Sequence, residues 1–198
     1  MSIKKITKGL IISLLLDSGL AVAADFDKGV EAYQSGDFKT AIAEWTPLAE
    51  QGNSDAQFYI AYMYHEGQGV PQNYKTAMKW YTTMAKQGDR WAQSSLAAMY
   101  SKGEGVPQNY KTAVKWYTLA AEQGYDQAQN NLGVMYSEGA GVLTDNRLAY
   151  MWYNLASYNG NEIGGENKDI IAKQMTPADI SKAQDMSSRC LESNYTNC

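Results

Sequence analysis

The sequence predicts an all-α protein, an α/α solenoid of about four helix-turn-helix repeats closed by a C-terminal capping helix. Residues 67–82 read GQGVPQNYKTAMKWYT and residues 103–118 read GEGVPQNYKTAVKWYT, with fourteen identities in sixteen positions. Five sets of residues also recur every 36 positions: Gly52, Gly88, Gly124 and Gly160; Ala41, Ala77, Ala113 and Ala149; Ala56, Ala92 and Ala128; Tyr64, Tyr100 and Tyr136; and the Trp-Tyr pairs that begin at Trp80, Trp116 and Trp152. A fixed period of this length is the signature of a stacked repeat array.

The first element, residues 1–23, has the three parts of a secretory signal peptide. Three lysines precede an apolar run over residues 10–16, and the small-residue cleavage sequence AVA follows at 21–23. The apolar run is far shorter than the roughly 20 residues needed to span a bilayer. We therefore expect cleavage near Ala23/Ala24, a periplasmic or secreted protein, and no membrane insertion of the mature chain.

Residues 24–160 are expected to form the repeat array, each repeat being two helices joined by a turn. Residues that cap helix N-termini recur in phase at Asp37, Asn73, Asn109 and Asp145. From Ala77 to Ala85, apolar residues follow the i, i+3, i+4, i+7, i+8 pattern of an amphipathic helix. Gly67, Gly69 and Pro71 suit the turn between two helices. We expect the helix pairs to begin near Phe26, Ala56, Ala92 and Ala128.

The two ends of the array depart from the repeat. Tyr33 precedes its capping residue Asp37 by four positions, whereas Tyr64 precedes Asn73 by nine, so the first hairpin should have a tighter turn. Residues 161–198 are expected to form C-terminal capping helices and a tail. There Thr176 suits an N-cap and Pro177 the first helical position, which predicts a last helix to about Cys190.

The chain has two cysteines, Cys190 and Cys198, both close to the C-terminus. In an exported protein, such a pair favours a disulfide, and free thiols are the alternative. Closing so short a loop would stabilise the fold by roughly 2–3 kcal/mol.

Charge and motifs narrow the classes of function. Without residues 1–23, Lys plus Arg falls from 17 to 14 and Asp plus Glu from 21 to 20, a net charge of −6. A negative chain argues against nucleic acid as a partner. The single histidine, His65, excludes an HExxH metal motif, and neither a GxSxG elbow nor a GxxxxGK[ST] phosphate loop occurs. We therefore expect no catalytic role, no cofactor and no metal site.

Residues 128–160, AQNNLGVMYSEGAGVLTDNRLAYMWYNLASYNG, resemble the Sel1-like repeat, a relative of the tetratricopeptide repeat, and the resemblance covers roughly residues 26–160. The ending IIAKQMTPADISKAQDMSSRC is similar to the C-terminal cap of exported bacterial members. The family implies a solenoid used for protein–protein contact, often in periplasmic assemblies or at host interfaces. Some cysteine-rich members are linked to penicillin binding and β-lactamase activity. Those members carry a cysteine pair in nearly every repeat, whereas this chain carries one.

The expected function is a monomeric periplasmic scaffold or adaptor that binds a protein or peptide. An exported effector that contacts a host protein and a weak β-lactamase-like hydrolase are the alternatives. In tetratricopeptide-like stacks the first helix of each pair lines the concave face, so partner-binding residues are sought there. Aromatic anchors are typical of binding surfaces, and the candidates are Phe58, Tyr62, His65 and Trp91. The alternative for Phe58 and Tyr62 is that they fill space between the first two repeats.

Overall fold

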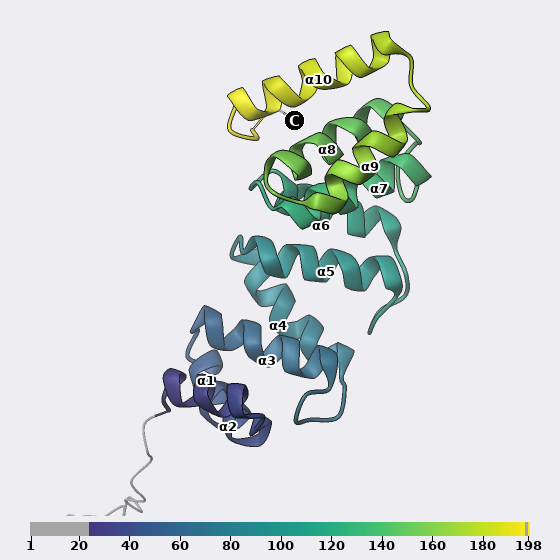
Figure 1. Ribbon diagram of the computed structural model, residues 1–198. Coiled ribbons are helices and arrows are strands. Elements are labelled where there is room, and N and C mark those ends of the chain that lie inside the picture. Colours follow the sequence, from purple (N-terminus) through teal and green to yellow (C-terminus); the bar gives the residue numbers. More distant parts are fainter. Residues whose placement is uncertain (1–23, 197) are drawn as a thin grey trace, which may run out of the picture.

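The computed structural model describes residues 24–196 and 198, and these residues form ten helices and no strand (Figure 1). The helices are α1 (Phe26–Ser35), α2 (Phe38–Glu50), α3 (Ser54–Glu66), α4 (Tyr74–Lys86), α5 (Arg90–Lys102), α6 (Tyr110–Ala121), α7 (Asp126–Glu138), α8 (Asn146–Tyr158), α9 (Glu162–Ala172) and α10 (Pro177–Glu192). The all-α prediction is confirmed, and the helix pairs begin within two residues of the expected positions. The predicted signal peptide lies outside the described residues.

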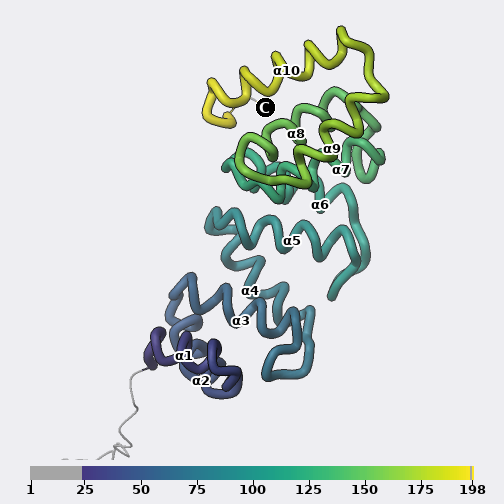
Figure 2. The backbone as a smooth tube through the Cα atoms, in the orientation of Figure 1, coloured from purple at the N-terminus to yellow at the C-terminus, as the bar shows by residue number. Residues whose placement is uncertain are grey.

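From α1 to α9 each helix packs against the next one in the chain, and α10 packs against α8, so the structure forms a stack of helix pairs. Figures 1 and 2 show this stack rising from α1 and α2 at one end to α10 at the other. We call α1, α3, α5, α7 and α9 the first helices and α2, α4, α6 and α8 the second helices. No helix among the described residues has the length and apolar character needed to cross a membrane.

The predicted caps and turns explain where the helices begin and end. The Asn73 side chain accepts a hydrogen bond from the Thr76 backbone N–H at 3.1 Å, and Asn109 accepts one from Thr112 at 3.0 Å. Gly67 ends α3 with a φ of +74°, in the left-handed region that favours glycine. The 36-residue period therefore repeats both a start signal and a stop signal.

Small residues allow close approach of the helices within the stack. Ala61 and Ala97 are fully buried, and Gly133 occupies the same position one repeat later. A Cβ on Gly133 would lie 2.6 Å from Cδ1 of Tyr153, closer than packed atoms approach. The tyrosine ring of α8 thus takes the space that a side chain on α7 would need.

Three buried glutamines, Gln57, Gln93 and Gln129, join successive repeats. Each donates its Nε2 to a carbonyl near the end of the preceding second helix: Ala49 at 3.0 Å, Ala85 at 3.2 Å and Ala121 at 3.1 Å. Each of these carbonyls also accepts from the backbone N–H of the glycine three residues on, so the glutamine adds a second hydrogen bond at the helix end. Sequence reasoning missed this set, although its 36-residue spacing was visible.

The carboxamide oxygens of the same glutamines differ in their partners. Gln93 Oε1 accepts from Gln123 Nε2 at 2.7 Å, and Gln129 Oε1 accepts from Asn159 Nδ2 at 2.8 Å. Gln57 Oε1 is buried and has no hydrogen-bond partner among the described residues. The first of the three junctions is therefore the least completely hydrogen-bonded.

The last two helices close the array differently from a further repeat. α9 packs against α7 and α8 as a first helix would, and α10 packs against α8 (Figure 1). The predicted start of α10 is confirmed, because Thr176 Oγ1 accepts from the Asp179 backbone N–H at 3.2 Å with Pro177 at the first helical position. α10 continues to Glu192, two residues beyond the expected end.

Candidate functional site

The first helices carry three columns of positions that vary between repeats, and we call these columns the first-helix face. The columns are positions 55, 91, 127 and 163; positions 58, 94, 130 and 166; and positions 62, 98, 134 and 170. Residues that only stack the repeats would recur at every position of a column. The residues of this face do not recur, which makes it the place to look for binding.

Three of the four candidate binding residues lie together on this face. The Phe58 ring centroid is 6.5 Å from that of Tyr62, with the rings nearly parallel, and 6.5 Å from that of Trp91, with the rings edge to face. Trp91 is 48% exposed, whereas Phe58 and Tyr62 are half-buried. Phe58 also packs against buried Tyr81 at 6.4 Å, so it borders both the core and the surface.

The fourth candidate, His65, connects two repeats. Its Nδ1 lies 2.7 Å from Glu66 Oε1, and its Nε2 lies 3.0 Å from Glu104 Oε2 in the turn between α5 and α6. The ring also meets Tyr74 and Tyr81 edge to face. Because each ring nitrogen contacts a carboxylate, His65 positions the side chains of Glu66 and Glu104. Its contact with Glu104, 39 positions away, could not be read from the sequence.

A cavity of about 250 Å³ opens beside the aromatic cluster. Ser54, Asp55, Phe58, Tyr59, Met84, Asp89 and Trp91 line it, from α3, the end of α4 and the start of α5. Buried Met84 and the three aromatic rings make an apolar interior, and the two aspartates supply its negative charge. This combination of apolar walls and few polar groups is typical of binding pockets.

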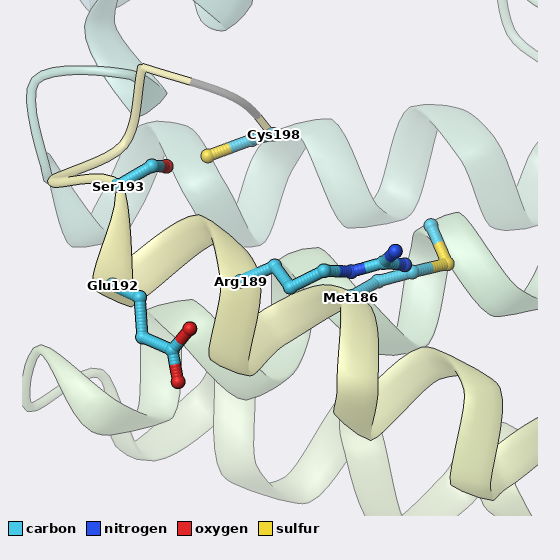
Figure 3. A pocket seen from close by; sticks show the side chains of 5 residues that line it. All are labelled: Met186, Arg189, Glu192, Ser193 and Cys198. Carbon is cyan, nitrogen blue, oxygen red and sulfur yellow. The ribbon is translucent and has the colours of Figure 1, made fainter.

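A larger hollow of about 580 Å³ lies between α10 and the C-terminal tail (Figure 3). Figure 1 shows α10 at the opposite end of the stack from α1 to α3. Met186, Arg189, Glu192, Ser193 and Cys198 line it. Figure 3 shows Arg189 extending along α10 towards Met186, while Glu192 points away from both. The hollow is wide and has no aromatic wall, so we consider the smaller cavity the better candidate site.

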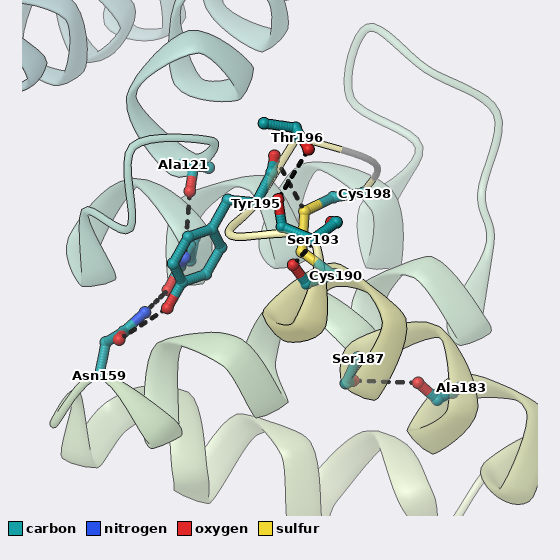
Figure 4. Close-up of a disulfide and its surroundings, with 10 residues drawn as sticks. Ala121, Asn159, Ala183, Ser187, Cys190, Ser193, Tyr195, Thr196 and Cys198 are labelled. Carbon is teal, nitrogen blue, oxygen red and sulfur yellow. Dashed lines mark hydrogen bonds between the residues drawn. A yellow bond between two sulfur atoms is a disulfide. The ribbon is translucent and has the colours of Figure 1, made fainter.

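The C-terminal cysteines meet beside this hollow (Figure 4). The Cα atoms of Cys190 and Cys198 are 4.7 Å apart, with the sulfur atoms at bonding distance. Between them, Tyr195 donates its hydroxyl to Asn159 Oδ1 at 2.9 Å, and Asn159 in turn donates to Gln129. The tail is thereby attached to the end of α8 and to a buried glutamine of α7.

The buried tyrosines of the second helices are structural groups. Burial raises the pKa of the Tyr117 hydroxyl to about 12, and burial also raises the pKa of Tyr81. These hydroxyls stay protonated at neutral pH and cannot act there as bases. Among the described residues, no group of three or more His, Cys, Asp or Glu side chains is placed to hold a metal ion.

Comparison with known proteins identifies the architecture. The family model described as the Sel1 repeat matches residues 54–89, 92–125 and 126–161. The chain belongs to the Sel1 repeat family. Proteins built of Sel1 repeats generally mediate protein–protein interaction. No curated protein matches the chain at a significant level.

Two solved structures of Sel1-repeat proteins are similar to this chain. A Sel1 repeat protein from Oxalobacter formigenes has a TM-score of 0.68 and 33% sequence identity, over 74% of this chain and 60% of that one. A protective antigen of uropathogenic Escherichia coli that displays an SLR fold has a TM-score of 0.51 and 30% identity, over 86% of this chain and 46% of that one. The chain thus spans 60% and 46% of the length of these two relatives.

The residue bounds of the three Sel1 matches show which candidate residues belong to the repeat pattern and which lie outside it. Phe58, Tyr62 and His65 fall inside the first matched repeat, whereas Trp91 falls in the gap between the first match and the second. Helices α1, α2, α9 and α10 lie outside all three matches. The Sel1 pattern therefore does not require a tryptophan at position 91.

Proposed function

We propose that this Sel1 repeat protein is an exported scaffold or adaptor that binds a protein or peptide on the first-helix face. The observation that carries the proposal is the cluster of Phe58, Tyr62 and Trp91. Trp91 is 48% exposed at a position that repeat stacking does not require. Large aromatic side chains near the centre of an interface supply much of its binding free energy.

We further propose that the protein acts in the periplasm after removal of residues 1–23. We also propose that the repeat array spans residues 24–160 and that residues 161–198 form its C-terminal capping segment. The approach of Cys190 to Cys198 supports it, since disulfides persist in oxidising compartments. We propose no catalytic role. The similarity to a protective antigen favours a secreted host-interacting protein as the second candidate, and cell fractionation distinguishes retention from release.

Capture of the partner from a periplasmic extract tests the first proposal. Trp91→Ala and Tyr62→Ala should each weaken capture at least about fivefold, which corresponds to about 1 kcal/mol. The melting temperature should stay nearly unchanged. Tyr158→Ala is the matched control, because it removes an aromatic ring that is 71% exposed at the end of α8.

Two other outcomes would contradict the proposal in different ways. A large fall in melting temperature for Tyr62→Ala would assign that ring to the core, as a space-filling residue between repeats. Unchanged capture with unchanged stability in both variants would place the binding surface elsewhere on the array.

A further inference from the structure

We propose that the 250 Å³ cavity beside Trp91 binds an arginine side chain of the partner. The cavity lies between α3, the end of α4 and the start of α5. This inference rests on the proposed function, because it names the chemistry of the partner that the first-helix face accepts. Four features of the cavity carry it: its aromatic walls, its carboxylates without an ion-pair partner, its size and the different residues at the same position in the following repeats.

The walls of the cavity suit a cation with an apolar stem. Phe58 stands edge to face against both Tyr59, at 6.0 Å between ring centroids, and Trp91, at 6.5 Å. A guanidinium or ammonium group within about 6 Å of an aromatic face is attracted by the ring, most strongly by tryptophan. The side chain of Met84 provides an apolar surface for the methylene groups.

Two carboxylates of the cavity are available for a cation. Neither Asp55 nor Asp89 forms an ion pair with a lysine, arginine or histidine of the described chain. Asp89 uses Oδ1 to cap the Ala92 backbone N–H at 2.7 Å. Arg90, the next residue, donates its Nη1 to the Gln123 carbonyl at 3.2 Å, and is thus engaged with the turn between α6 and α7.

The size of the cavity fits one side chain. Pockets for drug-sized ligands enclose about 300–1,000 Å³, and this one encloses about 250 Å³. A partner that inserts a single residue here would keep the rest of its chain along the first-helix face.

At the position of Asp89 in the next two repeats, other side chains make contacts within the protein. Tyr125 occupies the position of Asp89 one repeat later, and its ring lies 5.1 Å from that of Trp91. Two repeats later the same position is Asn161, whose Nδ2 donates to Asp126 Oδ2 at 2.9 Å. Of these three residues, Asp89 alone combines a short side chain with a negative charge, and it lines the cavity.

Arginine fits these groups better than lysine. Its planar guanidinium can stack on a ring while its five N–H donors reach two carboxylates, whereas an ammonium group is a compact point charge. We therefore expect both cations to bind and arginine to bind more tightly.

A titration of the purified protein with capped tripeptides tests the assignment. Acetyl-Ala-Arg-Ala-amide should shift the Trp91 indole N–H signal saturably in a ¹⁵N–¹H spectrum, with that signal identified through Trp91→Phe. Acetyl-Ala-Lys-Ala-amide should bind several-fold more weakly. The citrulline tripeptide, which keeps the shape but lacks the charge, should bind at least about tenfold more weakly, in line with the loss of charge-assisted hydrogen bonds.

Charge-neutralising variants locate the site. Asp55→Asn and Asp89→Asn should each raise the dissociation constant for the arginine tripeptide at least about fivefold, and asparagine at position 89 can still cap the helix. Asp185 is exposed on α10, outside the cavity. Asp185→Asn removes the same charge there and should leave binding unchanged. Unchanged melting temperatures would show that the aspartate variants remain folded.

Several results would overturn the inference. These are equal binding of the citrulline and arginine tripeptides, binding unaffected by both aspartate variants, or no saturable shift over the millimolar range. Partner capture that depends on Trp91 without any tripeptide binding would leave the scaffold function intact and reject the arginine pocket. Tripeptide binding without any partner capture would support the pocket and count against the scaffold function.

Discussion

The two ends of the first-helix face are built on the same columns and carry different chemistry. On α3 and α5 the face presents Phe58, Tyr62 and Trp91, with an open acidic cavity beside them. On α7 and α9 the same columns carry no aromatic ring: they hold Gln127, Asn130, Val134, Ile163, Glu166 and Ile170. Asn167, beside the face, donates to Asn130 Oδ1 at 2.9 Å. One end therefore combines aromatic rings with a charged cavity, and the other carries polar and aliphatic side chains, of which Ile163 and Ile170 are exposed.

The stacking residues do not share this difference. Buried alanines and glutamines recur through α3, α5 and α7, and each glutamine bonds to the second helix before it. A repeat array can therefore change its surface without changing its core, because stacking fixes only some of the columns. The comparison predicts that the N-terminal end depends on aromatic packing and the C-terminal end on cross-links and hydrogen bonds.

The largest effect is expected from Trp45→Ala at the N-terminal end. Trp45 is fully buried, stacks on Tyr59 with centroids 4.4 Å apart, and donates its Nε1 to the Phe26 carbonyl at 3.1 Å. Removing so large a ring from a core costs about 3–5 kcal/mol. Hydrogen exchange should show α1 and α2 losing protection while α7 and α8 keep theirs.

Trp152→Ala provides the matched control, because Trp152 is also buried, in α8. In this variant α7 and α8 should lose protection from hydrogen exchange, while α1 and α2 keep theirs. Equal loss of protection throughout the chain in both variants would mean that the array unfolds as one unit, and the two ends would then not be separable.

The next effect concerns the cross-link at the C-terminal end. Replacing both Cys190 and Cys198 by serine should lower the free energy of unfolding by roughly 2–3 kcal/mol and expose α10 to hydrogen exchange. Protein isolated from the periplasm should show no free thiol under denaturing conditions. Quantitative labelling of both cysteines would refute the disulfide and leave the tail held by the Tyr195 hydrogen bonds and by packing against the core.

The sequence was sufficient for the architecture because the architecture depends on recurring residues. The caps at Asn73 and Asn109, the left-handed Gly67 and the start of α10 at Pro177 are local signals, and each is confirmed. The 36-residue spacing added the order of the stack. Even the tighter first turn, between α1 and α2, could be read from the shorter distance between Tyr33 and Asp37.

The candidate site was only partly predictable. The variable columns identified Phe58, Tyr62 and Trp91, which the structure places together. The cavity depends on Met84 and Asp89, which reach it from a neighbouring second helix and from the turn after it. Such contacts between repeats depend on how helices pack, and no local signal in the sequence specifies them.

The smallest effects are expected from the buried glutamines that join successive repeats. Gln129→Leu would remove one of the two hydrogen bonds to the Ala121 carbonyl and would leave the Asn159 Nδ2 without its Gln129 acceptor, and should cost about 1–2 kcal/mol. Gln57→Leu would remove one bond to Ala49 together with an oxygen that has no partner among the described residues, and should cost less than about 1 kcal/mol. Urea unfolding of both variants gives the difference.

Gln93→Leu sharpens this last comparison, because Gln93 makes both kinds of bond and should behave like Gln129. If Gln57→Leu proves as costly as the other two, its oxygen has a donor in solution. Gln87 is the residue to examine, since it lies one repeat before Gln123, the donor to Gln93. A Gln87→Ala variant that is destabilised only when Gln57 is present would then show that the first junction is bonded like the others, and that the two ends of the array differ in their surfaces alone.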